Sequence, residues 1–536
     1  MPSYLDFNAH PSALPQSRSR SSGASAMAAS IGNQVGHKIK STLMQGRPNV
    51  DIELNSAHGI HGSFMTSYST MDKIEGTVNI TATQDTRFDE LDITFVGICK
   101  TYVDRLTSTP SLGGGRTTAT HRFLRLSQPI NEEDLPHPRI FAAGQTYKFP
   151  FTFVVPQHLL PRACSHKVDN DTVRDAHLRL PPSMGDPEVS GFASNLLDDM
   201  APEMAKVLYV IKVRGLQYRP EDDEALIVVD RVRKVRIKPA FEEQPPLSVD
   251  VAGASDYRLR QVKTIRKGLL KGKSGTLIME ASQPKPLHLP GARTGEAPVP
   301  ISTVAKVVLR FDPTDDSQQP PKLGSLTSRL KVITFHSSVP RTCFPVKSTL
   351  AYDISQGYYC MALPLASRCI ANTQWERQDG SSSPVFRRDS AASTVESSLT
   401  GIPAPSDNYH GKTFYTARIL VPITLPYNKN FLPTFHSCLI SRTYTLSLSL
   451  STPTSSLASA LTLKVPIQVS QGVSPEASAT IDEELEAAQD VEDMMRPRFV
   501  SPPSDEYGNS QSMDTDLPPQ YTFFAPRTYA TNISVL

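Results

Sequence analysis

Apolar side chains recur at every second position in many parts of this 536-residue chain, with polar residues between them. The segment Tyr147 to Val155 shows this alternation in the first half, and Tyr444 to Leu450 and Leu461 to Val469 show it in the second. A period of two places these side chains on one face of a β-strand, and aromatic and β-branched residues suit that pleated surface. The pattern therefore predicts amphipathic strands along most of the chain.

The same alternation, or a short continuous apolar run, predicts further strands. They are Val50 to Leu54, Ile74 to Ile80, Leu91 to Phe95, Ala205 to Val213, Ala225 to Ile237, Tyr257 to Ile265, Gly275 to Ala281, Val304 to Phe311, Leu330 to Phe335 and Thr413 to Ile423. The one clear helical pattern covers Ile481 to Met495 and is rich in Glu and Ala. Strands with one apolar face bury it by pairing sheets, so we expect an all-β protein of two tandem, immunoglobulin-like, antiparallel β-sandwiches.

Composition then divides the chain into folded and disordered parts. The 45 proline residues outnumber the 28 glycines and the hydrophobic fraction is only 39%, which is typical of a folded body with Pro- and Ser-rich disordered segments. We expect a disordered leader at 1–47, an N-terminal domain at 48–241 and a C-terminal domain at 242–470 that begins with a Pro-containing hinge. A disordered insertion is predicted at 378–411. A disordered tail with a short acidic helix is predicted at 471–536.

Charge and cysteine content restrict the class of protein. The 55 basic and 53 acidic residues leave a net charge of +2, which disfavours a general nucleic-acid binder. The six cysteines are scattered without a CxxC pair, as in reduced intracellular proteins. No apolar stretch approaches the length of a membrane span, and the N-terminus has no secretory pattern. These features predict a cytoplasmic location.

The predicted tail contains the motif Leu517-Pro518-Pro519-Gln520-Tyr521. Two prolines preset a polyproline II conformation, so the peptide loses little entropy when it docks into an aromatic groove, and Tyr521 can enter a second pocket of a WW domain. Short motifs of this kind also arise by chance. The position in an accessible, weakly hydrophobic tail supports a WW-domain-binding role for Leu517, Pro518, Pro519 and Tyr521.

A basic run ends the predicted strand Ala225 to Ile237. Its members are Arg233, Lys234, Arg236 and Lys238. With Val235 and Ile237 facing inward, Lys234, Arg236 and Lys238 are expected to project outward together. Two interpretations stay open: an anion- or cargo-binding stripe for phosphorylated peptides or anionic lipid head groups, and an edge strand whose charges oppose aggregation.

The predicted insertion contains a candidate phosphorylation site. Ser390 follows Arg387-Arg388-Asp389, a pattern that basophilic kinases recognise. A phosphate there would add about −1.5 to −2 charges beside two arginines and change a docking surface without changing the fold. Such short patterns are also frequent by accident.

Several short motifs suggest catalysis or cofactor binding, but the residues around them do not fit these functions. Gly272-Lys273-Ser274 resembles the end of a P-loop, but the preceding glycine is too close and a strand, not a helix, is predicted to follow. His58 and His61 lack the glutamate and the helix of a zinc motif. Cys438 is interpreted as a packed thiol. We therefore expect no enzyme activity, no cofactor and no metal site.

The order of these features resembles the arrestin-like trafficking adaptors, in particular the fungal α-arrestin type. In the first half the resemblance lies in Val50-Asp51-Ile52-Glu53-Leu54, Ile74-Glu75-Gly76-Thr77-Val78 and Gly144-Gln145-Thr146-Tyr147-Lys148-Phe149-Pro150-Phe151. In the second half it lies in the run from Leu432 to Tyr444, where a proline-aromatic turn leads into a strand. It covers about residues 48 to 470. The familiar Pro-Gly-Asp step before the second strand is replaced by Ser69 to Lys73.

This resemblance implies a cytosolic adaptor that binds cytosolic segments of plasma-membrane transporters or receptors, with peripheral contact to anionic membrane. The tail would recruit a WW-domain HECT-type ubiquitin ligase and promote ubiquitin-dependent endocytosis and sorting, with recruitment to the plasma membrane and endosomes. The alternative is an arrestin-fold scaffold of the retromer-subunit or ambient-pH-signalling type, without ubiquitin ligation as its main output. An endosomal partner that persists without the tail would distinguish this scaffold.

Overall fold

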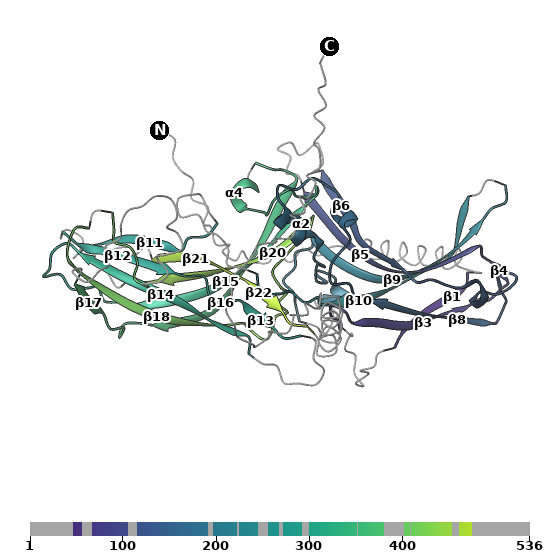
Figure 1. Cartoon of the computed structure of the whole chain (residues 1–536), viewed down its shortest axis with the longest axis horizontal. Helices are drawn as coiled ribbons and strands as arrows, with labels where there is room; N and C mark the ends of the chain where they lie inside the picture. Colours follow the sequence, from purple (N-terminus) through teal and green to yellow (C-terminus); the bar gives the residue numbers. More distant parts are fainter. Residues whose placement is uncertain are drawn as a thin grey trace, which may run out of the picture. The chain divides into compact units, whose positions relative to one another are not determined.

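The structure is a computed structural model, and strands dominate the residues that it describes (Figure 1). The described ranges are 47–55, 67–104, 115–190, 197–221, 224–244, 256–266, 272–291, 300–350, 352–379, 401–407, 409–452 and 460–473. The predicted leader up to residue 46, the tail from 474 with its predicted helix, and part of the predicted hinge lie outside these residues. The all-β prediction is confirmed.

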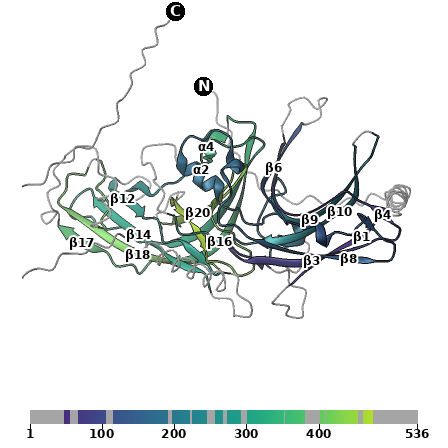
Figure 2. The same cartoon turned by 45° about the vertical axis from the view of Figure 1, so that its right-hand side comes forward.

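Two sheets form the first sandwich. The smaller sheet has the order β1-β3-β8, and the larger has the order β2-β10-β9-β5-β6. All pairings are antiparallel except that of β2 with β10. The strands are β1 Asn49–Leu54, β2 Ser67–Tyr68, β3 Lys73–Thr81, β5 Glu90–Asp104, β6 Arg116–Ser127, β8 Thr146–Val154, β9 Ala205–Tyr218 and β10 Ala225–Ile237. Figure 2 shows β3 and β8 in one layer and β9 and β10 in the other.

Alternation places the apolar side chains of this sandwich between its layers. Phe153 of the small sheet meets Phe95 of the large sheet, and Phe95 stacks on Tyr209, with ring centroids 5.9 and 5.8 Å apart. Gly76 is required where β3 lies between β1 and β8, because a Cβ there would overlap the Phe151 ring and the backbone of β1. The predicted inward positions of β3 and β8 are buried as expected.

Short elements fill the connections of the first sandwich. They are β4 Thr86–Arg87, η1 Glu132–Asp134, β7 Ile140–Phe141, η2 Pro161–Cys164, α2 Asp171–Leu178 and α3 Pro187–Ser190. Helix α2 begins after Asn170, whose side-chain oxygen accepts a hydrogen bond from the Val173 N–H at 2.9 Å, an N-cap that satisfies one free backbone donor. Among the described residues, no helix has the length and apolar character needed to cross a membrane.

The second sandwich also has two main sheets. One has the order β11-β12-β14-β18-β17; the other has the order β16-β15-β20-β19, with β21 also paired to β20. A parallel pair, β13 with β22, lies beside them. The elements are β11 Arg260–Arg266, β12 Lys273–Ala281, β13 Leu287–Leu289, β14 Ser302–Pro313, β15 Ser325–Ser337, α4 Lys347–Leu350, β16 Gln356–Cys369, β17 Glu376–Asp379, β18 Thr413–Thr424, β19 Phe435–His436, β20 Ile440–Leu450, β21 Leu461–Ile467 and β22 Val469–Gln471.

Buried apolar side chains form two clusters, which we name the first and second core. The first core comprises side chains of the first sandwich together with four from the second half of the chain, Leu432, Phe435, Leu439 and Ile440. The second core comprises side chains of the second sandwich and Met200 from the first half. Each half of the chain therefore contributes to the core of the other.

The strands predicted from alternation are all present, whereas β6 and β16 were not predicted. In both strands the side chains alternate between exposed and half-buried positions along most of the length, because each strand lies at the edge of its sheet. Such a strand needs few large apolar residues, so it leaves a weak periodic pattern in the sequence.

The predicted disordered insertion at 378–411 is wrong at both of its ends. Gln378 and Asp379 belong to β17 and pair with Phe414 and Thr413 of β18. Residues 401–407 contact the same sheet through hydrogen bonds. Residues 380–400, which include Ser390, lie outside the described residues.

Candidate functional site

The basic run at the end of β10 is largely engaged by other parts of the first sandwich. Arg233 is exposed, and its Nη1 donates a hydrogen bond to the carbonyl oxygen of Ile52 at 2.5 Å. The Lys234 ammonium lies 2.9 Å from Asp186 Oδ2 and 3.1 Å from Glu188 Oε2. Burial disfavours the charged lysine, but these two carboxylates outweigh it and raise the pKa of Lys234.

The solvent exposure predicted for Arg236 is wrong. Its side chain is buried, and burial lowers its pKa against the favourable charge of Asp199. Ser183 pairs with the edge of β10 at this point: its N–H donates to the Ile237 carbonyl oxygen, and its Oγ accepts from the Ile237 N–H. Lys238 is half-buried, and burial, followed by the charge of Arg236, lowers the pKa of Lys238 from 10.5 to about 8.

These contacts change how the basic run is interpreted. Two of its four charges are withdrawn from full solvent exposure, and a third is paired with two carboxylates. Because paired and desolvated charges attract a distant anion poorly, these contacts favour the structural interpretation over an open stripe for phosphates or lipid head groups. We assign it a structural role in closing the end of the first sandwich.

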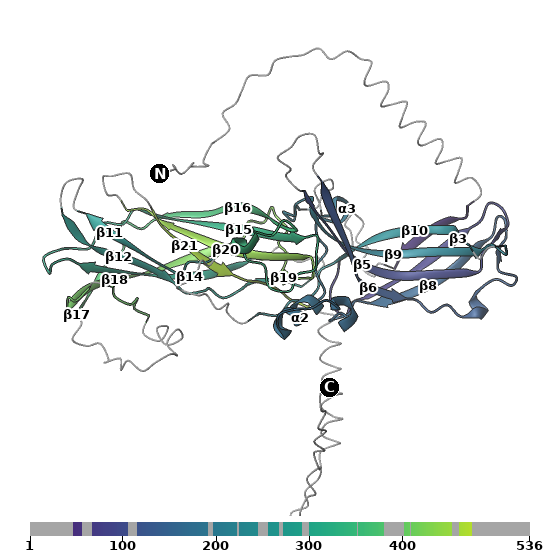
Figure 3. The same ribbon diagram turned by 90° about the horizontal axis from the view of Figure 1, so that it is seen from above.

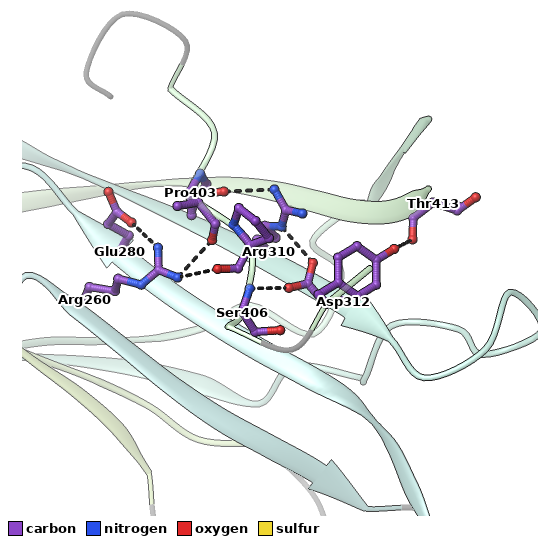
Figure 4. A network of polar contacts seen from close by, with 10 residues as sticks. Arg260, Glu280, Arg310, Asp312, Pro403, Ser406 and Thr413 are labelled. Carbon is purple, nitrogen blue, oxygen red and sulfur yellow. Dashed lines mark hydrogen bonds and ion pairs between the residues drawn. The ribbon is translucent and has the colours of Figure 1, made fainter. Parts of the chain in front are cut away.

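A second polar site lies on the outer face of the sheet β11-β12-β14-β18-β17. There residues 401–407, which we name the strap, cross β14 (Figure 4). Arg310 donates from Nη1 to the carbonyl oxygen of Pro403 at 3.0 Å, and the Ser406 N–H donates to Asp312 Oδ2 at 2.8 Å. Arg310 and Asp312 also bond directly, Nε to Oδ1, at 2.7 Å.

The charges of this site are strongly shielded from solvent. The side chains of Arg310 and Asp312 are 8% and 1% exposed. The Arg310 guanidinium carbon lies 3.9 Å from the centre of the Phe414 ring, a cation–π contact that gains strength on desolvation. A buried ion pair is tolerated only when its hydrogen bonds are satisfied. The strap supplies one hydrogen bond to each member of this pair, and the pair in turn holds the strap on the sheet.

Arg260 of β11 extends the contact to the rest of the strap. Its Nη2 donates to the carbonyl oxygens of Ala404 and Pro405 at 2.9 and 3.0 Å, and its Nη1 lies 3.4 Å from Glu280 Oε2 (Figure 4). The strap and β17 thus attach both ends of the segment 380–400 to one sheet. The sequence patterns did not predict this site. Its signal in the sequence is two charged residues at a spacing of two: Arg310 lies within the predicted strand Val304 to Phe311, and Asp312 directly follows it.

Polar contacts also join the two halves of the chain. Arg442 of β20 is fully buried and donates from Nη1 to the carbonyl oxygen of Asp199 at 3.2 Å. Lys429 lies 2.8 Å from Asp198 Oδ2, and although burial acts in the opposite direction, this bond and the Met200 N–H lower the pKa of Asp198. These contacts oppose separation of the two cores.

The remaining predicted site residues lie outside the described part of the chain. They are the tail motif Leu517, Pro518, Pro519 and Tyr521, and Ser390 in the predicted insertion. A scan against protein-family models finds no match to this chain, and a search of curated proteins finds none either. The roles of these residues stay predictions that depend on the sequence.

Proposed function

We propose that this protein is a non-catalytic adaptor. Its two β-sandwiches bind the cytosolic segment of a plasma-membrane transporter or receptor, and Leu517, Pro518, Pro519 and Tyr521 recruit a WW-domain HECT-type ubiquitin ligase. Recruitment places the ligase near cargo lysines at the plasma membrane and on endosomes. The observation that carries the proposal is the placement of a PPxY motif in a polar, Pro-rich segment that follows a two-sandwich all-β body.

The physical basis is tethering. A single PPxY peptide binds a WW domain weakly, but a ligase held on the same chain as the cargo acts at a high effective concentration. The folded body offers two long edge strands, β6 and β16, along which a peptide can add as a further strand. The basic run of β10 is not part of the proposal, because Lys234 is paired with two carboxylates and Arg236 is buried.

The test compares two tyrosines of the tail. Tyr507 follows Pro502-Pro503 at a spacing that does not fit the PPxY pattern, so Tyr507→Ala is the matched control for Tyr521→Ala. We expect the full-length Tyr521→Ala protein to lose binding to a recombinant tandem WW-domain ligase fragment by at least about tenfold, with Tyr507→Ala unchanged. Fluorescence titration gives both affinities. Equal ligase binding by the Tyr521→Ala and parent proteins would overturn the recruitment mechanism.

Phosphorylation of Ser390 is a regulatory extension of the proposal. In the sequence Ser390 lies between β17 and the strap, and the strap is bound by Arg260. A phosphate of about −1.5 to −2 charges on this segment would compete for the guanidinium that holds the strap. Hydrogen exchange of residues 401–407 in Ser390→Asp and Ser390→Ala proteins tests this: faster exchange in the aspartate variant alone is expected, and identical exchange would contradict it.

A further inference from the structure

Four side chains with sulfur and nitrogen donors converge between the two halves of the chain. Cys164 ends η2, His166 follows it, His177 lies in the last turn of α2, and Cys438 lies between β19 and β20. One donor atom from each of these residues lies within 4.8 Å of the others. Helix α2 and β19 lie side by side, which brings Cys438 to the three ligands of the first half (Figure 3).

The two shortest separations from the Cys164 sulfur match those between neighbouring ligands of a tetrahedral metal ion. Cys164 Sγ lies 3.3 Å from His166 Nε2 and 3.6 Å from His177 Nδ1. Zinc bonds of about 2.3 Å to sulfur and 2.0–2.1 Å to nitrogen place neighbouring tetrahedral ligands roughly 3.3–3.8 Å apart. All four donor atoms lie within 4.8 Å of one another, so the wider separations need to shorten by up to about 1 Å for one ion to bind all four.

Surrounding hydrogen bonds orient the ligands for this purpose. His166 Nδ1 lies 3.0 Å from the carbonyl oxygen of Lys167, and a proton on Nδ1 leaves Nε2 with a free lone pair directed at Cys164. Arg174 Nη1 donates to the Cys164 carbonyl oxygen at 3.0 Å and fixes the turn that carries the thiol. Cys164, His177 and Cys438 are buried, and His166 is half-buried.

We propose that Cys164, His166, His177 and Cys438 bind one zinc ion in a structural Cys2His2 site. Two thiolates and two imidazoles form a donor set that suits zinc, and carboxylates, which favour calcium or magnesium, are absent from this donor set. All four positions are filled by the protein, so no position is open for a water or a substrate. The ion links a segment of the first half to the turn that leads into β20.

Metal analysis of the full-length protein tests the proposal. After purification in zinc-containing buffer and dialysis, we expect about one zinc ion per chain by mass spectrometry of the metals, and tetrahedral cobalt absorption with thiolate character after cobalt exchange. Cys438→Ser should lower the zinc content to near zero. Cys99→Ser is the matched control, because Cys99 is also buried at the contact of the two halves and its Sγ lies 3.9 Å from the Ser437 hydroxyl, outside the donor group.

A second variant separates loss of metal from loss of fold. His166 is only half-buried, so His166→Gln removes a ligand without opening a cavity in the core. We expect this variant to keep the parent circular dichroism and to lose zinc. Retention of zinc by Cys438→Ser or His166→Gln, a parent protein without zinc, or a Cys164–Cys438 disulfide in the protein purified under air would each overturn the proposal.

Discussion

Lys238 directly follows β10, and its backbone N–H donates to the carbonyl oxygen of Tyr68 at 2.8 Å. The side chain of Lys238 is half-buried, and the charge of the buried Arg236 acts on it. Burial lowers the pKa of Lys238 to about 8, so the folded protein still protonates this amine at neutral pH, at a cost in free energy. The charged Lys238 side chain therefore lowers the free energy of unfolding, whereas an ordinary surface lysine does not.

Replacing Lys238 by methionine should therefore stabilise the protein. At neutral pH we expect Lys238→Met to raise the free energy of unfolding by about 1–2 kcal/mol, because methionine keeps the packing and removes the buried charge. Below pH 8 the difference is constant; as the pH rises from 8 toward 10.5 the parent loses its proton in the folded state and the difference disappears. Urea unfolding across this pH range measures the effect.

The control for this substitution is Lys148→Met on β8, where the lysine is exposed. Its unfolding free energy should change by less than about 0.5 kcal/mol and show no dependence on pH in this window. A destabilised Lys238→Met protein would show that the ammonium has a favourable partner and would refute the interpretation.

The strap is an element without regular secondary structure that is held by side chains of a strand. Arg310 and Asp312 project from the outer face of β14, whereas Leu309 and Phe311 project into the second core. An outer face is normally the solvent side of a sheet, so a nearly buried ion pair there depends on the strap that covers it. Removal of one charge should affect both stability and the position of the strap.

Asp312→Ala should destabilise the protein by about 3–5 kcal/mol, because it leaves the Arg310 guanidinium buried without its carboxylate. The double variant Arg310→Met/Asp312→Leu should be more stable than Asp312→Ala. Limited proteolysis within residues 401–407 should become faster in Asp312→Ala. Urea unfolding and peptide mapping give these values.

The chain offers a matched control for this prediction on β17, in the same sheet. Arg377 and Asp379 of β17 have the same spacing and lie 3.6 Å apart, but their side chains are 59% and 70% exposed. Asp379→Ala should cost less than about 1 kcal/mol, as is usual for exposed pairs. Similar costs for Asp312→Ala and Asp379→Ala would mean that burial does not determine the strength of the first pair.

Sequence patterns predict elements well in this protein where one face of a strand is fully apolar, as in β8 and β20. They fail for the edge strands β6 and β16, and for α2, an eight-residue helix whose start depends on the Asn170 cap. They also fail to predict the burial of Arg236. A period of two predicts which face of the strand a side chain takes, but not whether other parts of the chain cover that face.

The candidate sites were less accessible to sequence reasoning than the strands. Cys164, His166 and His177 are close in sequence and give a weak local signal, but the fourth donor, Cys438, meets them only through the fold. The strap has the same difficulty, since its composition is that of a loop and its partners Arg260 and Arg310 come from earlier strands. Long-range contacts of this kind leave no periodic trace in one sequence.

At the scale of the whole molecule, the two cores share residues across the midpoint of the chain. Phe435 and Leu439 belong to the second half but are buried in the first core, and Met200 is buried in the second. Arg442 and Lys429 add polar contacts across the same contact region. We infer that each sandwich is stabilised in part by side chains from the other half of the chain.

Phe435→Ala should weaken the first sandwich although the residue lies in the second half. We expect a loss of about 3–5 kcal/mol in unfolding free energy, with amide hydrogen exchange accelerated more in β5 and β9 than in β12 and β14. Phe431→Ala is the matched control, since Phe431 is buried in the second core and should give the opposite distribution. Equal acceleration in both sandwiches for both variants would contradict the assignment of separate cores.

The burial of Phe435 and Leu439 in the first core has a consequence for folding during protein synthesis. Translation proceeds from the N-terminus at about 5–20 residues per second, so these side chains emerge roughly 10–40 s after β10. Throughout that interval the first sandwich exists on the ribosome with part of its apolar surface uncovered, a surface that chaperones bind. The sandwich that is synthesised first is thus completed only after most of the second sandwich has been synthesised.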